Sequence, residues 1–309
     1  MKRLLCLAIG CLMAVPASAV VLDGSIAGDG YSLVTTQTVE TQFGDNESEL
    51  NAAWAQVSGG TLYVTLTGNL QDNFNKLNVF IDSIPGGENV ITNDTNNGGN
   101  NPTNDGWASK YAGFTFDTGF AADYLMIMRN GNGNQFDFDF NSVGSASVVE
   151  VSGNIFSGSI QGSNASVGAS GIGVAFDNSN SAGVIGGTAA ADQTAAQAVQ
   201  TGIELAIPLA AIGSPAAGSV VKITAMVNGS NHDFLSNQFL PGLTAPQGNL
   251  GGDGNGGFTG TVGQLDFAQF ASDQETFNIV IPRVIPEPTS FALLGLSLVG
   301  LACGRAKRG

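Results

Sequence analysis

The feature that most constrains the fold is a two-residue glycine turn between two runs of strand-forming residues. Gly59-Gly60 separates residues 49–58 from residues 61–67, and apolar side chains recur at every other position of the second run. Paired glycines adopt the positive φ angles of tight hairpin turns, and a period of two places the apolar side chains on one face. We therefore predict an antiparallel β-hairpin with one face in a hydrophobic core.

Similar short runs recur along the chain, whereas only residues 188–200, rich in alanine, predict a helix, and residues 209–212 a short turn or helix. The 44 glycines favour tight turns over helices. We predict an all-β fold, an antiparallel β-sandwich of jelly-roll-like form, with long loops rich in glycine and asparagine at 86–106 and 238–260. Further strands are expected at residues 32–41, 77–82, 114–117, 122–129, 135–140, 143–151, 155–160, 202–208, 220–227 and 276–281.

The first 19 residues have the pattern of a secretory signal peptide. Lys2 and Arg3 precede an apolar stretch at 4–15, and the small residues Ala17 and Ala19 stand at the positions that signal peptidase reads. We predict cleavage after Ala19 and hence export of the chain.

The segment 283–309 combines three features in a fixed order. Pro286-Glu287-Pro288 comes first, and its prolines favour an extended, accessible conformation. An uncharged apolar run follows at 290–302, shorter than the roughly 20 residues that span a bilayer comfortably. Arg305, Lys307 and Arg308 then form a basic stop, which is typical of the cytoplasmic side of a membrane. The order indicates a sorting signal that is processed and then discarded.

This tail resembles the PEP-CTERM sorting tail of exported bacterial proteins, which is also labelled an ice-binding protein C-terminal domain. The resemblance implies recognition by an exosortase, a membrane-embedded, transpeptidase-like enzyme, during export to the cell surface or the extracellular polymer. Until then the apolar run would anchor the chain in the inner membrane. The alternative is a plain C-terminal anchor. We thus divide the chain into a signal peptide (1–19), a body (20–282) and a sorting tail (283–309).

The body has an unusual composition once the terminal segments are set aside. Cys6, Cys11 and Cys303 all lie outside it, so it forms no disulfide and no cysteine-based metal or redox site. Residues 20–286 carry five basic and 24 acidic side chains, a net charge of −19. Such a charge repels nucleic acid and anionic membrane surfaces, and it keeps an exported protein soluble.

Four phrases of the body stand out: Leu22-Asp23-Gly24, residues 59–69, Phe80-Ile81-Asp82 with Gly86-Gly87, and residues 202–209. They resemble the β-sandwiches of the DOMON-like and family 9 carbohydrate-binding-module group. The resemblance implies an extracellular binding sandwich without catalysis. Sugar-binding members of the group stack sugars on aromatic rings, whereas haem-binding members use methionine and histidine ligands.

Catalytic chemistry would have to rest on carboxylates or on the single histidine. Asp137 and Asp139 share one face of the alternating segment 135–140, roughly 7 Å apart, a spacing compatible with glycosidase carboxylates. We expect them on a solvated outer face instead. His232 lies in a polar loop without a G-x-S-x-G elbow, so we expect a solvated or locally hydrogen-bonded side chain and assign no catalytic residue.

Oxygen-rich clusters at three places suggest calcium as the alternative to plain hydrated turns. They are Asp45-Asn46-Glu47, the loop at 93–105, and Asp253-Gly254-Asn255. Hard oxygen ligands suit Ca²⁺, but none of the three has the spacing of an EF-hand loop or an RTX repeat. We therefore expect hydrated turns and assign no metal ligand and no cofactor.

Trp54, Trp107 and Tyr111 are the candidates for sugar stacking. Trp107 and Tyr111 border the asparagine-rich loop and would lie at a loop-rich rim. The alternative is structural: Trp54 fills the core and Trp107 anchors the loop.

The leading functional expectation is a non-enzymatic protein of the cell surface or extracellular matrix whose body binds polysaccharide. One alternative is a surface-attached glycan hydrolase, which needs a cleft with two facing carboxylates about 5–10 Å apart. The other is a self-assembling surface protein, which needs an uncovered sheet edge or apolar patch. A binding module would instead expose an aromatic platform.

Overall fold

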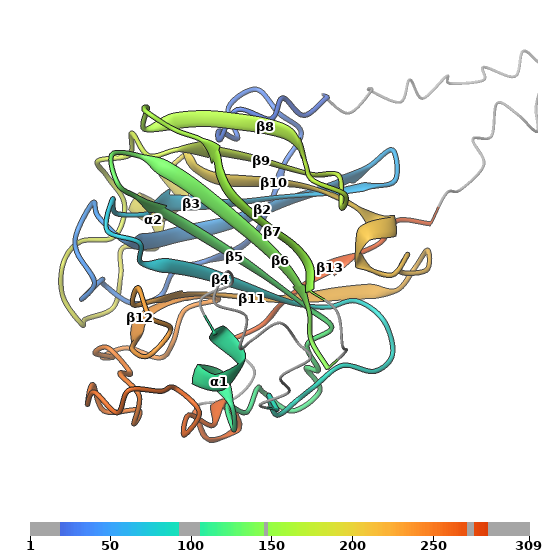
Figure 1. Cartoon of the computed structure of the whole chain (residues 1–309). Helices are drawn as coiled ribbons and strands as arrows, with labels where there is room; N and C mark the ends of the chain where they lie inside the picture. Colours follow the sequence, from blue (N-terminus) through green and yellow to red (C-terminus); the bar gives the residue numbers. More distant parts are fainter. Residues whose placement is uncertain (1–18, 93–105, 145–147, 271–274, 284–309) are drawn as a thin grey trace, which may run out of the picture.

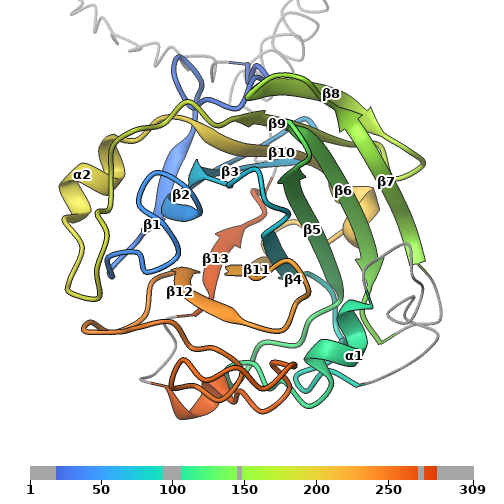
Figure 2. The ribbon, with the colours of Figure 1, turned by 60° about the vertical axis from the view of Figure 1, so that its left-hand side comes forward.

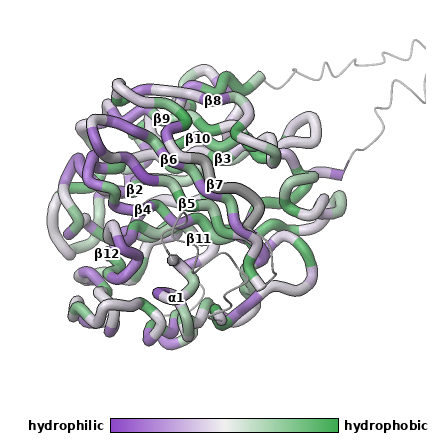
Figure 3. The backbone as a smooth tube through the Cα atoms, viewed as in Figure 1, coloured by the Kyte–Doolittle hydropathy of each residue, from purple (hydrophilic) through white to green (hydrophobic). Residues whose placement is uncertain are grey.

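The computed structural model describes residues 19–92, 106–144, 148–270 and 275–283. In these residues two antiparallel β-sheets face each other and enclose a hydrophobic core (Figure 1). The predicted β-sandwich is therefore confirmed. Apolar and polar stretches alternate along the strands of both sheets (Figure 3).

The first sheet contains strands from the beginning of the body and strands from its middle. Its central pair, β3 with β10, brings Val64 opposite Leu205. In spatial order its strands are β1 (Ser32–Thr36), β2 (Glu49–Ser58), β3 (Thr61–Asn69), β10 (Gly202–Pro208), β9 (Ile172–Asp177) and β8 (Gln161–Val167).

The second sheet has β11 near one edge and β7 at the other. The short strand β13 pairs with the beginning of β11 and β12 with its end, so both lie on the same side of β11. In spatial order the strands are β12 (Leu235–Leu240), β11 (Val220–Asn228), β4 (Lys76–Asp82), β5 (Tyr124–Gly131), β6 (Gln135–Ser142) and β7 (Val148–Phe156), with β13 (Phe277–Val280) added beside β11.

The predicted hairpin forms between β2 and β3. Gly59 and Gly60 have φ angles of 59° and 81°, and Ser58 lies opposite Thr61. Positive φ at both central residues matches the twist of the flanking strands, which is why two glycines occupy the turn. The alternate residues Leu62, Val64 and Leu66 are buried in the core between the sheets, as the period of two predicts.

The strand order consists of meanders and differs from the jelly roll that the prediction favoured. Two connections lead from the first sheet to the second, β3 to β4 and β10 to β11. Because β3 is antiparallel to β10, and β4 to β11, these two connections cross at opposite ends of the sandwich. In a jelly roll a paired double strand is folded across both sheets together, and that arrangement is not formed here.

A layer of helix and loops covers the outer face of the second sheet and creates a second hydrophobic core (Figure 2). The layer contains α1 (Trp107–Tyr111), residues 112–122, and residues 241–270 with the short helix η4 (Phe267–Gln269). Phe80, Leu125 and Ile127 point from the sheet into this core. Much of the layer had been predicted as surface loop, because its apolar residues are widely spaced in the sequence.

The alanine-rich helix is shorter than predicted. Helix α2 spans Gln193–Ala198, and η3 spans Leu209–Ile212 as expected of a short helix or turn. The Asp192 carboxylate accepts hydrogen bonds from the backbone N–H groups of Thr194 and Ala195, which fixes the start of α2. Val199 is already extended, so the segment before residue 192 and after 198 stays non-helical.

Three strand predictions also need correction. Residues 114–117 form isolated bridges instead of a regular strand, with Thr115 opposite Val90 and Asp266, and Phe114 and Phe116 are buried in the second core. The predicted strands at 143–151 and 155–160 are replaced by β7, and β8 was not predicted because its sequence is polar and its strand lies at a sheet edge.

Candidate functional site

The predicted aromatic platform at Trp107 and Tyr111 does not form, because both side chains are completely buried. They lie on α1 and face the second sheet, where Phe80 contacts Trp107 and Tyr111 edge-to-face at ring distances of 6.5 and 5.4 Å. A buried ring offers no face to a sugar. The structural alternative applies to Trp107, which anchors α1 on the sheet.

Trp54 lies on the outer face of the first sheet and is partly exposed. It stands opposite Leu33 on β1 and Thr65 on β3, and its neighbours Ala53 and Ala55 point into the core between the sheets. The core position considered for Trp54 is therefore wrong. Of the three aromatic candidates, it is the one with a side chain at the surface.

Asp137 and Asp139 are buried, which corrects the expectation of a solvated outer face. They lie beside Arg129 of β5: its Nε is 3.3 Å from an Asp137 oxygen, and its Nη1 is 2.6 Å from an Asp139 oxygen. Asp137 also accepts hydrogen bonds from the Gln135 side-chain amide at 2.9 Å and from the Asn154 backbone N–H at 2.5 Å. Two carboxylates that share a buried guanidinium are suited to structural support, and they lack the open cleft of a glycosidase.

His232 is fully buried and not solvated. Its Nδ1 is 3.4 Å from the Asn78 amide nitrogen, and its ring meets Tyr111 edge-on at 6.2 Å. Burial lowers the pKa of His232 well below its ordinary value, and the positive charges of Lys76, Arg129 and Lys110 lower it further. His232 is therefore neutral at physiological pH.

The neighbours of His232 make no catalytic triad with it. The Ser236 hydroxyl donates to the backbone oxygen of Val227 at 2.8 Å, and Asp233 pairs with Lys110 at 3.9 Å. Each polar side chain thus has a separate structural partner, and acyl-transfer chemistry has no support in this loop.

Glu49 lies at one end of the sandwich, and its buried carboxylate has a raised pKa. Its carboxylate accepts hydrogen bonds from the Asn46 backbone N–H at 2.9 Å and from the side-chain amides of Asn51 and Asn180, both at 3.0 Å. Burial raises the pKa of Glu49 to about 7, and the nearby charge of Asp45 contributes to the rise.

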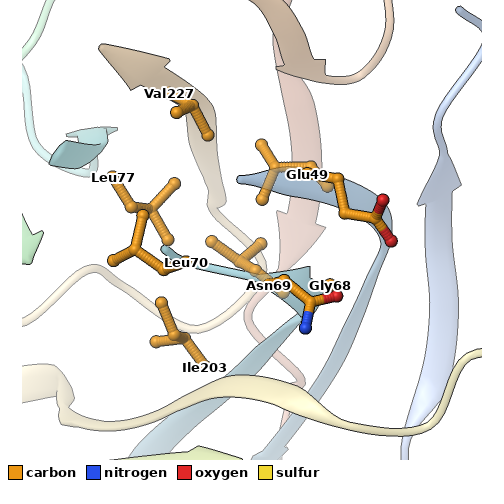
Figure 4. Close-up of a pocket in the computed structure, with 9 residues that line it drawn as sticks. Glu49, Gly68, Asn69, Leu70, Leu77, Ile203 and Val227 are labelled. Atoms are coloured by element: carbon orange, nitrogen blue, oxygen red, sulfur yellow. The ribbon is translucent and has the colours of Figure 1, made fainter. Parts of the chain in front are cut away.

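Figure 4 shows what surrounds Glu49 on its inner side. The side chains of Leu70, Leu77, Ile203 and Val227 converge on an apolar space, and the Glu49 carboxylate turns away from them. This space is too small to admit a water molecule. The Glu49 region is thus a closed end of the core, and it holds no ligand-sized pocket.

Glu204 fastens the beginning of the body to the outer face of the first sheet. One of its oxygens accepts the backbone N–H groups of Asp23 and Gly24, each at 2.9 Å, and the other accepts the Tyr31 hydroxyl at 2.6 Å. Gly24 has a φ of 83°, and a Cβ there would come within 2.6 Å of the Asp177 nitrogen. The phrases at 22–24 and 202–209, noted in the sequence, therefore meet in the structure through this clamp.

A groove of about 300 Å³ lies between the free edges of the two sheets. One wall consists of residues 30–34 and 55–57 from β1 and β2, and the other consists of residues 278–282 at and after β13. This groove is large enough to admit a small ligand, unlike the closed space beside Glu49. Its polar groups are few, and it contains no acidic side chain.

In the oxygen-rich turns considered as calcium sites, carboxylate oxygens accept local hydrogen bonds. Asp253 uses one oxygen to accept the backbone N–H groups of Asn255 and Gly257 at 2.9 and 2.8 Å, and Asn46 donates to both Asp45 and Glu49. Within the described ranges, no group of three or more histidine, cysteine, aspartate or glutamate side chains is arranged to hold a metal ion. The loop at 93–105 lies outside the described residues.

Arg129, Glu204 and Glu49 were not singled out from the sequence. Arg129 is one of four basic residues in the body and stands in the apolar strand sequence 125–129, a position that signals a buried ionic partner. Glu204 likewise interrupts an apolar strand. Nothing in the local sequence distinguishes Glu49 from the acidic residues beside it, because its asparagine partner Asn180 is far away in the chain.

The comparisons with known proteins identify the tail. The family model of the PEP-CTERM protein-sorting motif matches residues 284–308, a range that contains Pro286, Glu287 and Pro288 together with Arg305, Lys307 and Arg308. No curated protein and no solved structure matches the chain. The likeness of the body to DOMON-like and carbohydrate-binding modules gains no support from these searches.

The predicted sorting tail is thereby confirmed, and it marks the chain as an exosortase substrate bound for the cell surface or the extracellular space. Residues 1–18 of the signal peptide, including Ala17, and residues 284–309 of the tail lie outside the described residues. Among the helices in the described ranges, none has the length and apolar character that crossing a membrane requires.

Proposed function

We propose that the chain is an exported surface or matrix protein whose sandwich body is non-catalytic, and that residues 290–302 anchor it in the inner membrane until an exosortase processes the tail. The observation that carries this proposal is the sorting motif at 284–308, which begins one residue after the last described residue of the body. The tail directs the protein to the cell surface or the extracellular space, so the body acts there.

The non-catalytic role is supported by the partners of the titratable groups. Asp137 and Asp139 share Arg129, Glu204 holds backbone N–H groups, and His232 is neutral and enclosed. These contacts stabilise the fold and leave the carboxylates without access to a substrate. A hydrolase would instead aim two carboxylates into an open cleft.

Polysaccharide binding is proposed on the outer face of the first sheet at Trp54. The support is geometric: Trp54 is partly exposed on a sheet face, and Tyr63 on the next strand is also partly exposed. Aromatic rings at a sheet surface give sugars an apolar face to stack on.

The delivery part is tested by cell fractionation in a bacterium that has an exosortase. We expect the wild-type chain in the surface or medium fraction and the Pro286→Ala/Pro288→Ala variant in the inner membrane. Pro282→Ala, an exposed proline just before the motif, is the matched control and should follow the wild type. Equal distribution of all three chains would refute the proposal.

The binding part is tested by electrophoresis of the chain through gels that contain neutral or acidic polysaccharides. We expect retardation of the wild type, loss of retardation in Trp54→Ala, and wild-type behaviour in the buried control Trp107→Phe. Wild-type migration without retardation on every polymer would exclude this role.

A further inference from the structure

The two ends of the described body lie on one side of the molecule. Figures 1 and 2 show both of them away from α1 and the loops that cover the second sheet. The Val21 backbone N–H bonds to the Asp29 carboxylate at 3.2 Å, and the next residue, Gly30, lines the groove together with residues 278–282. The start of the body and its last strand therefore meet around the groove between β1 and β13.

Exposed apolar side chains are found next to both ends. Val21 and Val280 each have 60% of their surface exposed, Val220 has 42% and Leu33 has 40%. Val220 and Val280 stand opposite each other on β11 and β13, and Leu33 follows groove residue Ser32 on β1. We call this surface, made of Val21, Leu33, Val220, Val280 and the groove, the exit face.

The distance from the exit face to the apolar run of the tail is short. Six residues, 284–289, separate Arg283 from the run that begins at residue 290, and six residues reach at most about 20 Å when fully extended. A compact body of this length has a diameter of roughly 45 Å. The tether is thus much shorter than the body, so a body anchored by the run cannot turn its other faces toward the membrane.

We infer that, while the tail is anchored, the exit face rests on the outer surface of the lipid bilayer. This inference depends on the membrane anchoring proposed above. Four exposed apolar side chains gain contact with the interfacial region of the lipids, and the exposed Arg283 adds a positive charge at the point where the chain leaves the body.

The sorting motif is part of this short tether. Pro286 is three residues after Arg283, which corresponds to about 10 Å of extended chain. A membrane-embedded enzyme that acts on this motif would therefore work directly under the exit face, and the shape of that face would affect its access.

The absence of cysteine from residues 20–286 permits a direct test with single fluorescent labels. In the chain without its signal peptide (residues 20–309) and with Cys303→Ser, an environment-sensitive dye is attached at Val21→Cys or Val280→Cys. Ile185→Cys and Phe258→Cys are matched controls, since these apolar residues are 61% and 71% exposed and lie outside the exit face. The chains are reconstituted with phosphatidylcholine vesicles that contain spin-labelled lipid.

We expect the spin-labelled lipid to quench the dye at positions 21 and 280 about twofold more strongly than at 185 and 258, since an interfacial contact lies within quenching range. Equal quenching at the four positions would overturn the inference and leave the anchoring intact. Vesicle flotation, measured first on each chain, tests the premise separately: a chain that does not float with vesicles refutes both the anchoring and the contact.

Discussion

Glu49 and Glu204 are buried carboxylates whose oxygens are occupied by hydrogen-bond donors of the protein. Each has a raised pKa because burial disfavours the charged form more strongly than the donors favour it. Their donors come from segments far apart in the sequence, Asn180 for Glu49 and Asp23 for Glu204. Through these hydrogen bonds, Glu49 connects a loop to the sandwich and Glu204 connects the beginning of the body to it.

Glu49 should make the stability of the body depend on pH. Its pKa rises from 4.5 to about 7 on folding, so the folded state binds the proton more tightly than the unfolded chain. The free energy of unfolding therefore falls as the pH rises from 4.5 to 7, by about 3 kcal/mol from this residue. Urea unfolding at pH 5 and pH 8 should show this loss in the wild type and a smaller one in Glu49→Gln. Parallel pH profiles of the two proteins would contradict it.

Glu204 should stabilise the beginning of the body through its role as an acceptor. Glu204→Ala leaves two backbone N–H groups and the Tyr31 hydroxyl without their acceptor, and we expect a loss of about 3 kcal/mol in the free energy of unfolding. Glu204→Gln keeps one oxygen for the two N–H groups and should lose about 1 kcal/mol. Denaturant titration distinguishes the two, and equal losses would show that the charge, not the acceptor geometry, matters.

The sequence predicts an element well when the residues that stabilise it lie close together in the chain. The hairpin at Gly59-Gly60 was predicted because both the turn and the alternation lie within 20 residues. The burial of Asp137 was not predicted, because its partners Arg129 and Asn154 lie on the neighbouring strands β5 and β7. For Trp107 the sequence left sugar stacking and anchoring both open, because its partner Phe80 is on a strand and the sequence between them is a long polar loop.

The ion pairs of β5 and β6 should be essential for the second sheet. Arg129→Met removes the cation beside Asp137 and Asp139 and leaves two buried carboxylates without it. We expect the free energy of unfolding to fall by about 3–5 kcal/mol, the usual cost of breaking a buried ion pair. The matched control is Lys222→Met, which breaks a pair with Asp82 whose lysine is 34% exposed. That loss should be below about 1 kcal/mol. Similar losses at both sites, measured by urea unfolding, would contradict the buried role of Arg129.

Helix α1 should depend on Trp107 for its attachment. Trp107→Ala removes a fully buried ring from the second core, and we expect a loss of about 3–5 kcal/mol. Trp54→Ala, at a partly exposed position, should lose clearly less. Unfolding followed by far-UV circular dichroism measures both, and a larger loss for Trp54 would show that the two tryptophans have been assigned to the wrong environments.

At the scale of the whole molecule, the described body has two hydrophobic cores, one on each side of the second sheet. The two ends of the described body lie on one side of the molecule (Figures 1 and 2). The sequence sufficed for the sorting tail, because its match rests on a short contiguous motif. It did not suffice for a ligand site on the body, because the aromatic and acidic candidates acquire their environment from distant segments.

The central claim, that the body is delivered by a processed tail, is tested most directly by intact mass spectrometry of the protein recovered from the cell surface or medium. The account predicts a chain that begins at Val20 and ends within residues 286–289, without the apolar run at 290–302. A recovered chain whose mass includes the run and the basic residues Arg305, Lys307 and Arg308 would contradict it.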